Sequence, residues 1–282
     1  NQVTVRPFSL IHHRNHKELW SRKGEYLESI KNIYNEHKSA IFMVYIPDSY
    51  IGLISAYYLK KVNANWFTRV TSDQLKEMKV RGGSLVRRVA YYFLRPIHIL
   101  FMKWLLHDII QIYTGNKLFY NNKYTYSVNS SNLTLTDIKD KKFIRNDVFK
   151  LLYVGRFDQL KGINFLIDSL SKLSLENYKL DIIGFDTNEN KDKLLKLINN
   201  SDKKEKINFI GQVKYGEELF SYYDKADILI LPSLQETQGN THLEAMARGV
   251  SVIATNVGGI PNIVKHNITG ILVKPSSSIE IK

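Results

Sequence analysis

Residues 233–249 read S-L-Q-E-T-Q-G-N-T-H-L-E-A-M-A-R-G and place two carboxylates, Glu236 and Glu244, eight positions apart. The apolar run before them, residues 227–233, predicts a buried strand, so the stretch leaves the carboxyl end of that strand. In doubly wound sheets this end is where ligands bind. The stretch therefore predicts a parallel α/β sheet and the position of a site on it.

The residues between the two carboxylates predict a helix that begins at a phosphate-binding turn. Gly239 can adopt backbone angles that other residues avoid. Asn240 and Thr241 are suitable first residues of a helix running to about Arg248. The unpaired first amides and the positive end of the helix dipole favour a bound phosphate. Because the nearby carboxylates would repel a phosphate, the pattern also predicts cations at the same edge of the sheet.

Two cations follow a second predicted strand. Residues 150–155, K-L-L-Y-V-G, form a short apolar run, and R-F-D-Q-L-K-G follows at residues 156–162. Arg156 and Lys161 project from this loop, where a guanidinium and an ammonium could neutralise a diphosphate without metal. An alternative interpretation makes Arg156 a salt-bridge partner of Asp158 and Lys161 a solvated residue at a helix start.

Four motifs occur together in the second half of the chain. They are V-G-R-F-D-Q-L-K-G at residues 154–162, the Glu236/Glu244 pair, L-E-A-M-A-R-G at residues 243–249 and N-V-G-G-I-P at residues 256–261. In their order and spacing they resemble the GT4 family of glycosyltransferases, and the joint match is far more specific than any single motif.

The resemblance implies a fold and a reaction. The fold is the α/β GT-B type, in which two Rossmann-like domains with parallel sheets face a central cleft. The reaction is transfer of a sugar from a nucleotide-diphosphate sugar to a glycan or lipid-linked acceptor, with retention of anomeric configuration. The resemblance also implies a place in the synthesis of cell-surface polysaccharide such as capsule, O-antigen or lipopolysaccharide.

The resemblance further implies roles for individual residues. As the diphosphate departs, Arg156 and Lys161 would stabilise its negative charge. Glu236 would contact the donor sugar near the reacting carbon. The residues implied in donor binding are Glu244, which would accept hydrogen bonds from the ribose, and Gly239, Asn240, Thr241, Gly211, Gln212 and Val213. The turn at residues 211–213 would hold the nucleotide base, largely through backbone groups.

No cofactor and no metal ion are expected. The first strand of the second half is not followed by G-x-G-x-x-G, which disfavours a dinucleotide, and the chain has no D-x-D triplet. His12, His13 and His16 are closely spaced. No carboxylate or cysteine completes a ligand set there, so a solvated loop is favoured over a metal site.

The sequence predicts two domains, an acceptor-side domain over residues 1–147 and a nucleotide-sugar-binding domain over residues 148–282. In the first, residues 39–46, 50–61 and 66–70 read as strand, helix and strand, a parallel unit with a right-handed crossover. In the second, strands and helices alternate regularly.

Three features depart from the family pattern. Its opening strand with a glycine-rich loop is not recognisable in residues 1–10, so the first domain is expected to be incomplete. Residues 71–73, T-S-D, stand where many relatives have a histidine, and Asn262 stands where relatives often have a glutamate. These departures concern the acceptor side and the surroundings of the donor more than the diphosphate-binding residues.

Residues 84–113 are rich in aromatic, aliphatic and basic side chains, and Pro96 predicts a bend or a division into two helices. The stretch reads either as an interfacial helix lying on lipid or as a core helix with a basic outer face. Residues 1–149 contain 23 Lys/Arg and 11 Asp/Glu, a net charge of +12, whereas residues 150–282 contain 17 and 16, a net of +1. The basic half suits an anionic membrane or an acidic glycan.

The expected location is the cytoplasm, with peripheral contact on the inner face of the cytoplasmic membrane. The chain has no cysteine and shows no secretory signal, and no apolar run reaches the roughly 18 residues of a spanning helix. Nucleic acid is not an expected partner. Two alternative functions remain, a GT-B isomerase acting on a nucleotide sugar and a non-catalytic nucleotide-sugar-binding subunit.

Overall fold

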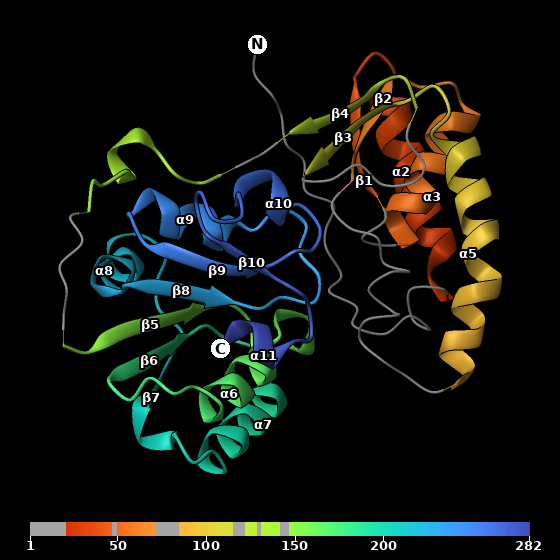
Figure 1. The fold of residues 1–282 in the computed structure, drawn as a ribbon. Coiled ribbons are helices and arrows are strands. Elements are labelled where there is room, and N and C mark those ends of the chain that lie inside the picture. Colours follow the sequence, from red (N-terminus) through yellow and green to blue (C-terminus); the bar gives the residue numbers. More distant parts are fainter. Residues whose placement is uncertain (1–20, 47–49, 71–84, 115–121, 129–130, 142–146) are drawn as a thin grey trace.

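The chain forms two parallel sheets, each with its own helices (Figure 1). The computed structural model describes residues 21–46, 50–70, 85–114, 122–128, 131–141 and 147–282. The N-terminal sheet has the order β1-β2-β3-β4, and the C-terminal sheet has the order β10-β9-β8-β5-β6-β7.

The N-terminal sheet is built from β1 (Phe42–Ile46), β2 (Trp66–Val70), β3 (Ile110–Thr114) and β4 (Thr125–Val128). All neighbouring strands are parallel. Helices α2 (Lys23–Glu36), α3 (Tyr50–Lys61) and α5 (Leu85–Leu105) accompany them. Figure 1 shows α5 as the outermost helix. The core joins alternate residues of the strands, such as Val44 and Val70, to Leu59, Met102 and Leu105 of the helices.

Several predictions for this half are confirmed and others need correction. The strand, helix and strand between residues 39 and 70 form the predicted parallel unit, although the first strand begins at Phe42. Pro96 does not divide its helix, because α5 continues from Leu85 to Leu105. The proline is exposed, so its ring faces away from the core and the missing amide costs one hydrogen bond without ending the helix. The predicted helical stretch also ends early, since Tyr113 belongs to β3.

The C-terminal sheet is a doubly wound domain. Its strands are β5 (Phe149–Val154), β6 (Tyr178–Ile183), β7 (Ile207–Gly211), β8 (Ile228–Leu231), β9 (Ser251–Thr255) and β10 (Ile271–Val273). Its helices are α6 (Ile163–Ser171), α7 (Asn188–Asn199), α8 (Glu217–Lys225), α9 (Asn240–Ala247), α10 (Ile260–Ile263) and α11 (Ser278–Ile281). The regular alternation expected from the sequence is confirmed, and both faces of the sheet are covered.

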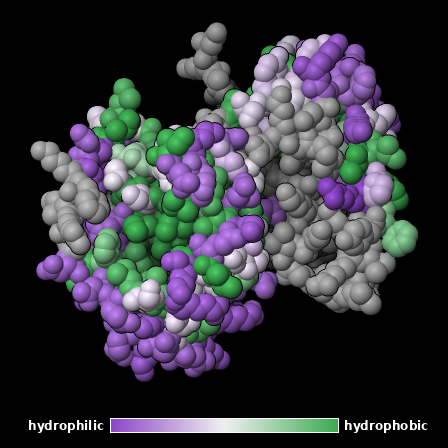
Figure 2. Space-filling view, viewed as in Figure 1, coloured by the Kyte–Doolittle hydropathy of each residue, from purple (hydrophilic) through white to green (hydrophobic). Residues whose placement is uncertain are grey.

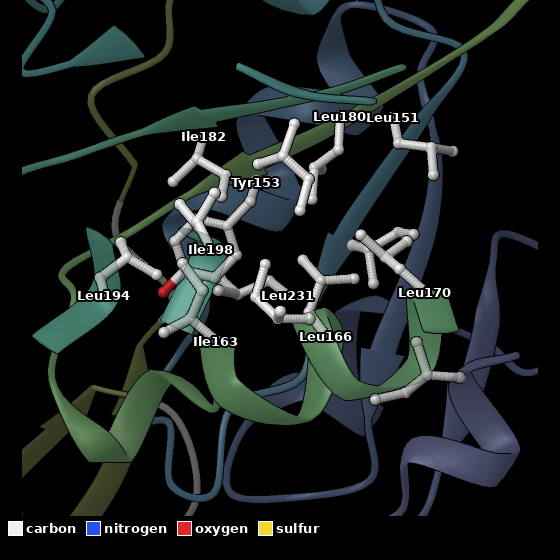
Figure 3. Packing of buried hydrophobic residues seen from close by; sticks show 14 of the residues in the cluster. Leu151, Tyr153, Ile163, Leu166, Leu170, Leu180, Ile182, Leu194, Ile198 and Leu231 are labelled. Carbon is white, nitrogen blue, oxygen red and sulfur yellow. The ribbon is translucent and has the colours of Figure 1, made fainter. Parts of the chain in front are cut away.

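Two hydrophobic clusters account for that coverage. On one face, Leu166 and Leu170 of α6 and Leu194 of α7 pack against Leu180 and Ile182 of β6 (Figure 3). On the other face, residues of α8 and α9 such as Tyr223 and Ala245 pack against β8 and β9. Parallel strands buried on both faces read as continuous apolar runs, which is why they were easy to find in the sequence.

The strand order locates the place where a ligand would bind. The chain runs outward from β5 through β6 to β7 and then returns to β8 on the opposite side of β5. Connections leaving β5 and β8 therefore diverge at their carboxyl ends. In open α/β sheets this switch point is where ligands bind.

The segment before β5 is fastened to the C-terminal half. Arg248, buried after α9, donates two hydrogen bonds to the carboxylate of Asp224, at 2.7 and 2.6 Å, and one to the backbone oxygen of Asp137 at 3.0 Å. Lys139 adds an ion pair with Asp224, and its amide bonds Ala247 O. Residues 137–139 thus contact α8 and α9 although they precede residue 148, and the predicted domain boundary stays a prediction.

Candidate active site

The loop after β5 carries both predicted cations. Asp158 accepts a hydrogen bond from the amide of Lys161 and so begins the short 3-10 helix Gln159–Lys161. Arg156 is half-exposed and pairs with Asp158, with 2.8 Å between Nη2 and Oδ2. The alternative partner suggested by the sequence for Arg156 is therefore present, while Lys161 is held over the sheet edge and is not solvated.

The loops after β5 and β8 lie in direct contact. The amide of Leu234 bonds the backbone oxygen of Leu160 at 2.7 Å. Gly162 has a positive φ of 67°, and a Cβ at this position would lie 2.0 Å from Pro232 O. Only glycine fits this approach. The two motifs, more than 70 residues apart in sequence, are therefore joined through their backbones.

This contact brings Lys161 and Glu236 together. Lys161 Nζ lies 2.5 Å from Glu236 Oε2, and the two side chains are only 18% and 13% exposed. Ser233 Oγ is 3.4 Å from the same carboxylate oxygen. Neither motif predicted that its charge would pair with that of the other. The pair places one cation and one anion at the carboxyl ends of β5 and β8.

Two buried aromatic side chains lie beneath this pair. The sequence did not indicate that either of them belongs to the site. The hydroxyl of Tyr153 donates to Arg156 O at 2.7 Å, and burial raises the pKa of Tyr153 far above its usual value, with Asp158 and Glu236 acting in the same direction. His242 is fully buried, which lowers its pKa to about 4, while Glu236 opposes and Lys161 favours that shift. His242 is thus neutral at ordinary pH and acts as packing under the charged pair.

The start of α9 is placed as the sequence predicted. Gly239 has a φ of 88°, and the helix begins at Asn240. The amides of Asn240 and Thr241 belong to the first turn, which has no hydrogen-bonding partners inside the helix. Gly258 and Gly259 lie against the preceding loop, since a Cβ at Gly258 would be 1.6 Å from Glu236 O. These close approaches fix the backbone of Glu236 ahead of the helix.

Glu244 lies one turn into α9 beside two tyrosines. The hydroxyl of Tyr223 donates to Glu244 Oε2 at 2.9 Å. Burial raises the pKa of Glu244, and the hydrogen bond from Tyr223 opposes that rise. Burial, with a smaller contribution from the charge of Glu244, raises the pKa of Tyr215 in the loop after β7. Both tyrosines were missed because nothing in their local sequence marks them.

The predicted base-binding turn follows β7. Gly211 has a φ of 85°, and its oxygen accepts a hydrogen bond from the amide of Gly184 at the end of β6. Gln212 is exposed, and Val213 packs against the cluster under α8. The turn therefore lies at the same edge of the sheet as Glu244, and β6 separates β7 from β5, whose loop carries Lys161.

Within the described part of the chain, no group of three or more histidine, cysteine or carboxylate side chains is placed to hold a metal ion. His12, His13 and His16 lie outside the described residues, as do residues 71–73. Arg156 and Lys161 are the cations of the loop after β5 at this edge. A phosphate group entering here would meet side-chain cations and helix amides.

The fold agrees with comparisons to known proteins. Residues 136–282 match the model of the family described as Glycosyl transferases group 1, and the chain belongs to this family. It is 34% identical over 164 residues to an uncharacterized glycosyltransferase of Methanocaldococcus jannaschii, a match that covers 57% of this chain and 41% of that protein. A protein of the cps region of Klebsiella pneumoniae is 34% identical over 137 residues, covering 47% of this chain and 36% of the relative. The matched region thus spans about two fifths of the length of these relatives.

Solved structures show the fold of the whole chain. A sucrose-phosphate synthase from Thermosynechococcus elongatus superposes with a TM-score of 0.71 at 19% identity, covering 95% of this chain and 69% of that one. A lipopolysaccharide outer core galactosyltransferase superposes with a TM-score of 0.66 at 16% identity, covering 93% and 69%. The expected GT-B architecture of two Rossmann-like domains is therefore confirmed.

Proposed function

We propose that the protein is a retaining glycosyltransferase that moves a sugar from a nucleotide-diphosphate sugar to a glycan or lipid-linked acceptor without a metal ion. The observation that carries the proposal is the Lys161/Glu236 ion pair at the switch point of the C-terminal sheet. Family membership of residues 136–282 supports it. So does an Anabaena protein of similar fold that was crystallised with UDP and glucose.

Donor binding would rearrange this ion pair. An incoming diphosphate carries more negative charge than Glu236 and would attract Lys161, supported by Arg156 and the amides of Asn240 and Thr241. Glu236 would then lose its cation partner just as the donor sugar arrives beside it. In the free enzyme, Lys161 thus neutralises the carboxylate of Glu236. Donor binding would separate the two and leave the carboxylate without its cation.

In the reaction, the bond between the anomeric carbon and the distal phosphate oxygen would break, with the electron pair staying on that phosphate. An acceptor hydroxyl oxygen would form the new bond to the anomeric carbon on the same face, and its proton would pass to the departing phosphate. Lys161, Arg156 and the helix amides would stabilise the new charge. The carboxylate of Glu236 would stabilise positive charge developing on the sugar. Glu244, held by Tyr223, would accept hydrogen bonds from the ribose, and the turn at residues 211–213 would hold the base.

The acceptor and its setting are part of the proposal. A relative, the amylovoran biosynthesis glycosyltransferase of Erwinia amylovora, is 30% identical over 153 residues, 49% of this chain and 37% of that protein. We place the protein likewise in cell-surface polysaccharide or lipopolysaccharide synthesis, in the cytoplasm, with its basic N-terminal half against an anionic membrane. None of the helices in the described ranges has the length and apolar character to cross a membrane.

The test is a thermal-shift panel with UDP, GDP, ADP, CMP and their common sugar conjugates, with EDTA present. A selective rise in Tm identifies the base and narrows the sugar, and a transfer assay with that donor follows. Binding without transfer to any glycan or lipid-linked acceptor would favour the non-catalytic subunit, and epimerised donor would indicate the isomerase. No shift in a folded sample, or a shift that EDTA removes, contradicts the proposal.

A further inference from the structure

Helix α5 is apolar on two opposite sides. Met102 and Leu105 are fully buried in the N-terminal core. A second row follows the other side at spacings of four, three and four residues: Phe93, Ile97, Leu100 and Trp104, exposed by 74%, 65%, 67% and 51%. A helix that packs on one core needs a single apolar face. The fold therefore accounts for one side of α5 and not for the other.

Helix α3 widens this second face. The ring centre of Tyr57 lies 6.1 Å from that of Trp104, and the ring of Phe101 lies 5.9 Å from Trp104. We call the resulting surface the outer apolar face; it comprises Tyr57, Phe93, Ile97, Leu100, Phe101 and Trp104. Hydrophobic residues gather in Figure 2 along the outer margin where Figure 1 places α5. Contiguous exposed apolar surface of this kind marks an interaction site.

The charges of the two helices are all of one sign. Neither α3 nor α5 contains an aspartate or a glutamate, whereas α3 contains Lys60 and Lys61 and α5 contains four further Lys/Arg. Lys60 Nζ lies 5.5 Å from the ring centre of Trp104. Lys60 thus borders the apolar surface itself, and with the positive charge of both helices this favours a partner that is both apolar and anionic.

A cavity opens beside this face. It has a volume of about 500 Å³ and lies between α2, α3 and α5. Leu27, Leu53 and Ile54 line it, and Tyr57 and Phe101 connect it to the outer apolar face. Lys31 and Lys61 also border it. Its size lies in the range of small-molecule sites, and its lining suits a hydrocarbon chain whose charged end meets lysine.

We infer that the outer apolar face docks on a bilayer surface rich in anionic lipid and that the cavity receives one acyl chain of a bound lipid. Helix α5 lies in the plane of the interface, with its apolar row in the acyl boundary and its cations at the headgroups. The tryptophan sits at the depth that this residue favours in membranes. The inference rests on the proposed function only in placing the acceptor at a membrane, and its physical basis is independent of donor binding.

The experiment is flotation of the full chain with phosphatidylcholine vesicles that contain or lack phosphatidylglycerol. The wild type is expected to float with the anionic vesicles and to be released by 1 M salt in part, since screening removes only the electrostatic share. The double variant Ile97→Glu/Leu100→Glu is expected to lose binding at least tenfold. Ile268→Glu/Ile279→Glu, which adds the same two negative charges at highly exposed sites of the C-terminal half, is the matched control and keeps wild-type binding.

A second arm tests the charges and the cavity. Lys60→Gln/Lys61→Gln is expected to weaken binding to anionic vesicles severalfold, whereas Lys204→Gln on the C-terminal half changes nothing. Leu53→Trp, which fills the cavity, is expected to reduce the uptake of a fluorescent acyl lipid while vesicle binding persists.

Two results would overturn the inference. One is a failure at the membrane, seen either as wild-type chain that does not bind anionic vesicles or as a double variant that binds them as well as the wild type does. The other is a wild-type dimer in light scattering that Ile97→Glu/Leu100→Glu converts to monomer, which would identify a second copy as the partner. The nucleotide thermal shift is measured on every variant. Failure of donor binding contradicts the proposed sugar transfer without affecting the vesicle result. Failure of vesicle binding contradicts this inference and the proposed membrane location without affecting donor binding.

Discussion

The two sheets of this chain share parallel strands but differ in how they are covered. In the C-terminal half, hydrophobic clusters pack on both faces of the sheet, and glycines bring the loops at its carboxyl edge into backbone contact. Among the described residues of the N-terminal half, one cluster packs on the sheet, and its outermost helix presents a second apolar face. The difference suggests that one half is built to hold groups in fixed positions and the other to meet a surface.

The largest expected effect sharpens this contrast at the charged pair. Glu236→Gln should lower the transfer rate about 100-fold or more, because it removes the charge beside the reacting sugar while keeping the shape of the side chain. Nucleotide binding should remain. Ile97→Glu on α5 is the N-terminal counterpart and should keep wild-type turnover with a water-soluble acceptor. Wild-type turnover in Glu236→Gln would show that its assigned role is wrong.

A second prediction concerns the packed loops. Gly162→Ala should destabilise the protein by about 3 kcal/mol, since the new Cβ meets Pro232 O and the positive φ is strained. Gly24→Ala in α2 meets nothing within 4 Å and should be neutral or stabilising by up to about 1 kcal/mol. Denaturant unfolding measures both. If Gly162→Ala and Gly24→Ala changed the free energy of unfolding equally, the C-terminal loops would not be more tightly packed than helix α2 of the N-terminal half.

The fastening of the segment before β5 gives a third prediction. Arg248→Met should cost about 2 kcal/mol, because it removes the two hydrogen bonds that Arg248 donates to the partly buried Asp224 and leaves only the one from Lys139. Lys139→Met removes the more exposed partner of the same carboxylate and should cost no more than about 0.5 kcal/mol. Urea unfolding compares them. If Lys139→Met lost more stability than Arg248→Met, the assignment of the main attachment to the Arg248/Asp224 ion pair would be wrong.

The smallest expected effect is a pH dependence. His242 has a folded pKa of about 4, below its ordinary value of 6.5, so the unfolded chain binds a proton first as the pH falls. Its contribution to stability is complete above about pH 6.5 and should decrease by about 1 kcal/mol between pH 7.5 and pH 5.5. In His242→Gln this part of the pH dependence should disappear, whereas His107→Gln, at an exposed position, should keep it. Unfolding curves at the two pH values decide between these outcomes.

Much of the C-terminal half could be predicted from the sequence. Its strands are apolar runs between clear turns, and the glycine before Asn240 marked the start of α9 correctly. In the N-terminal half, the predicted division of the helix at Pro96 is wrong, because a proline removes one hydrogen bond and the local sequence does not show whether packing of the rest of the helix compensates for it.

The candidate site was only partly visible in the sequence. The motif residues were found, but Tyr153, Tyr215 and Tyr223 resemble ordinary core or surface tyrosines until the sheet brings them to Arg156 and Glu244. The sequence likewise did not show that Lys161 pairs with Glu236. Long-range contacts depend on strand order, and local patterns carry little information about that order.

The sequence by itself determined the parallel α/β class, the motif residues at the strand ends and the uneven charge, because these follow from local spacing and composition. The tertiary structure decided that β8 returns beside β5, that Lys161 therefore meets Glu236, and that α5 leaves one apolar side uncovered. The physical reason is that the residues of a strand determine only which side chains point to each face of the sheet. Which strands become neighbours depends on how the whole sheet buries its apolar surface.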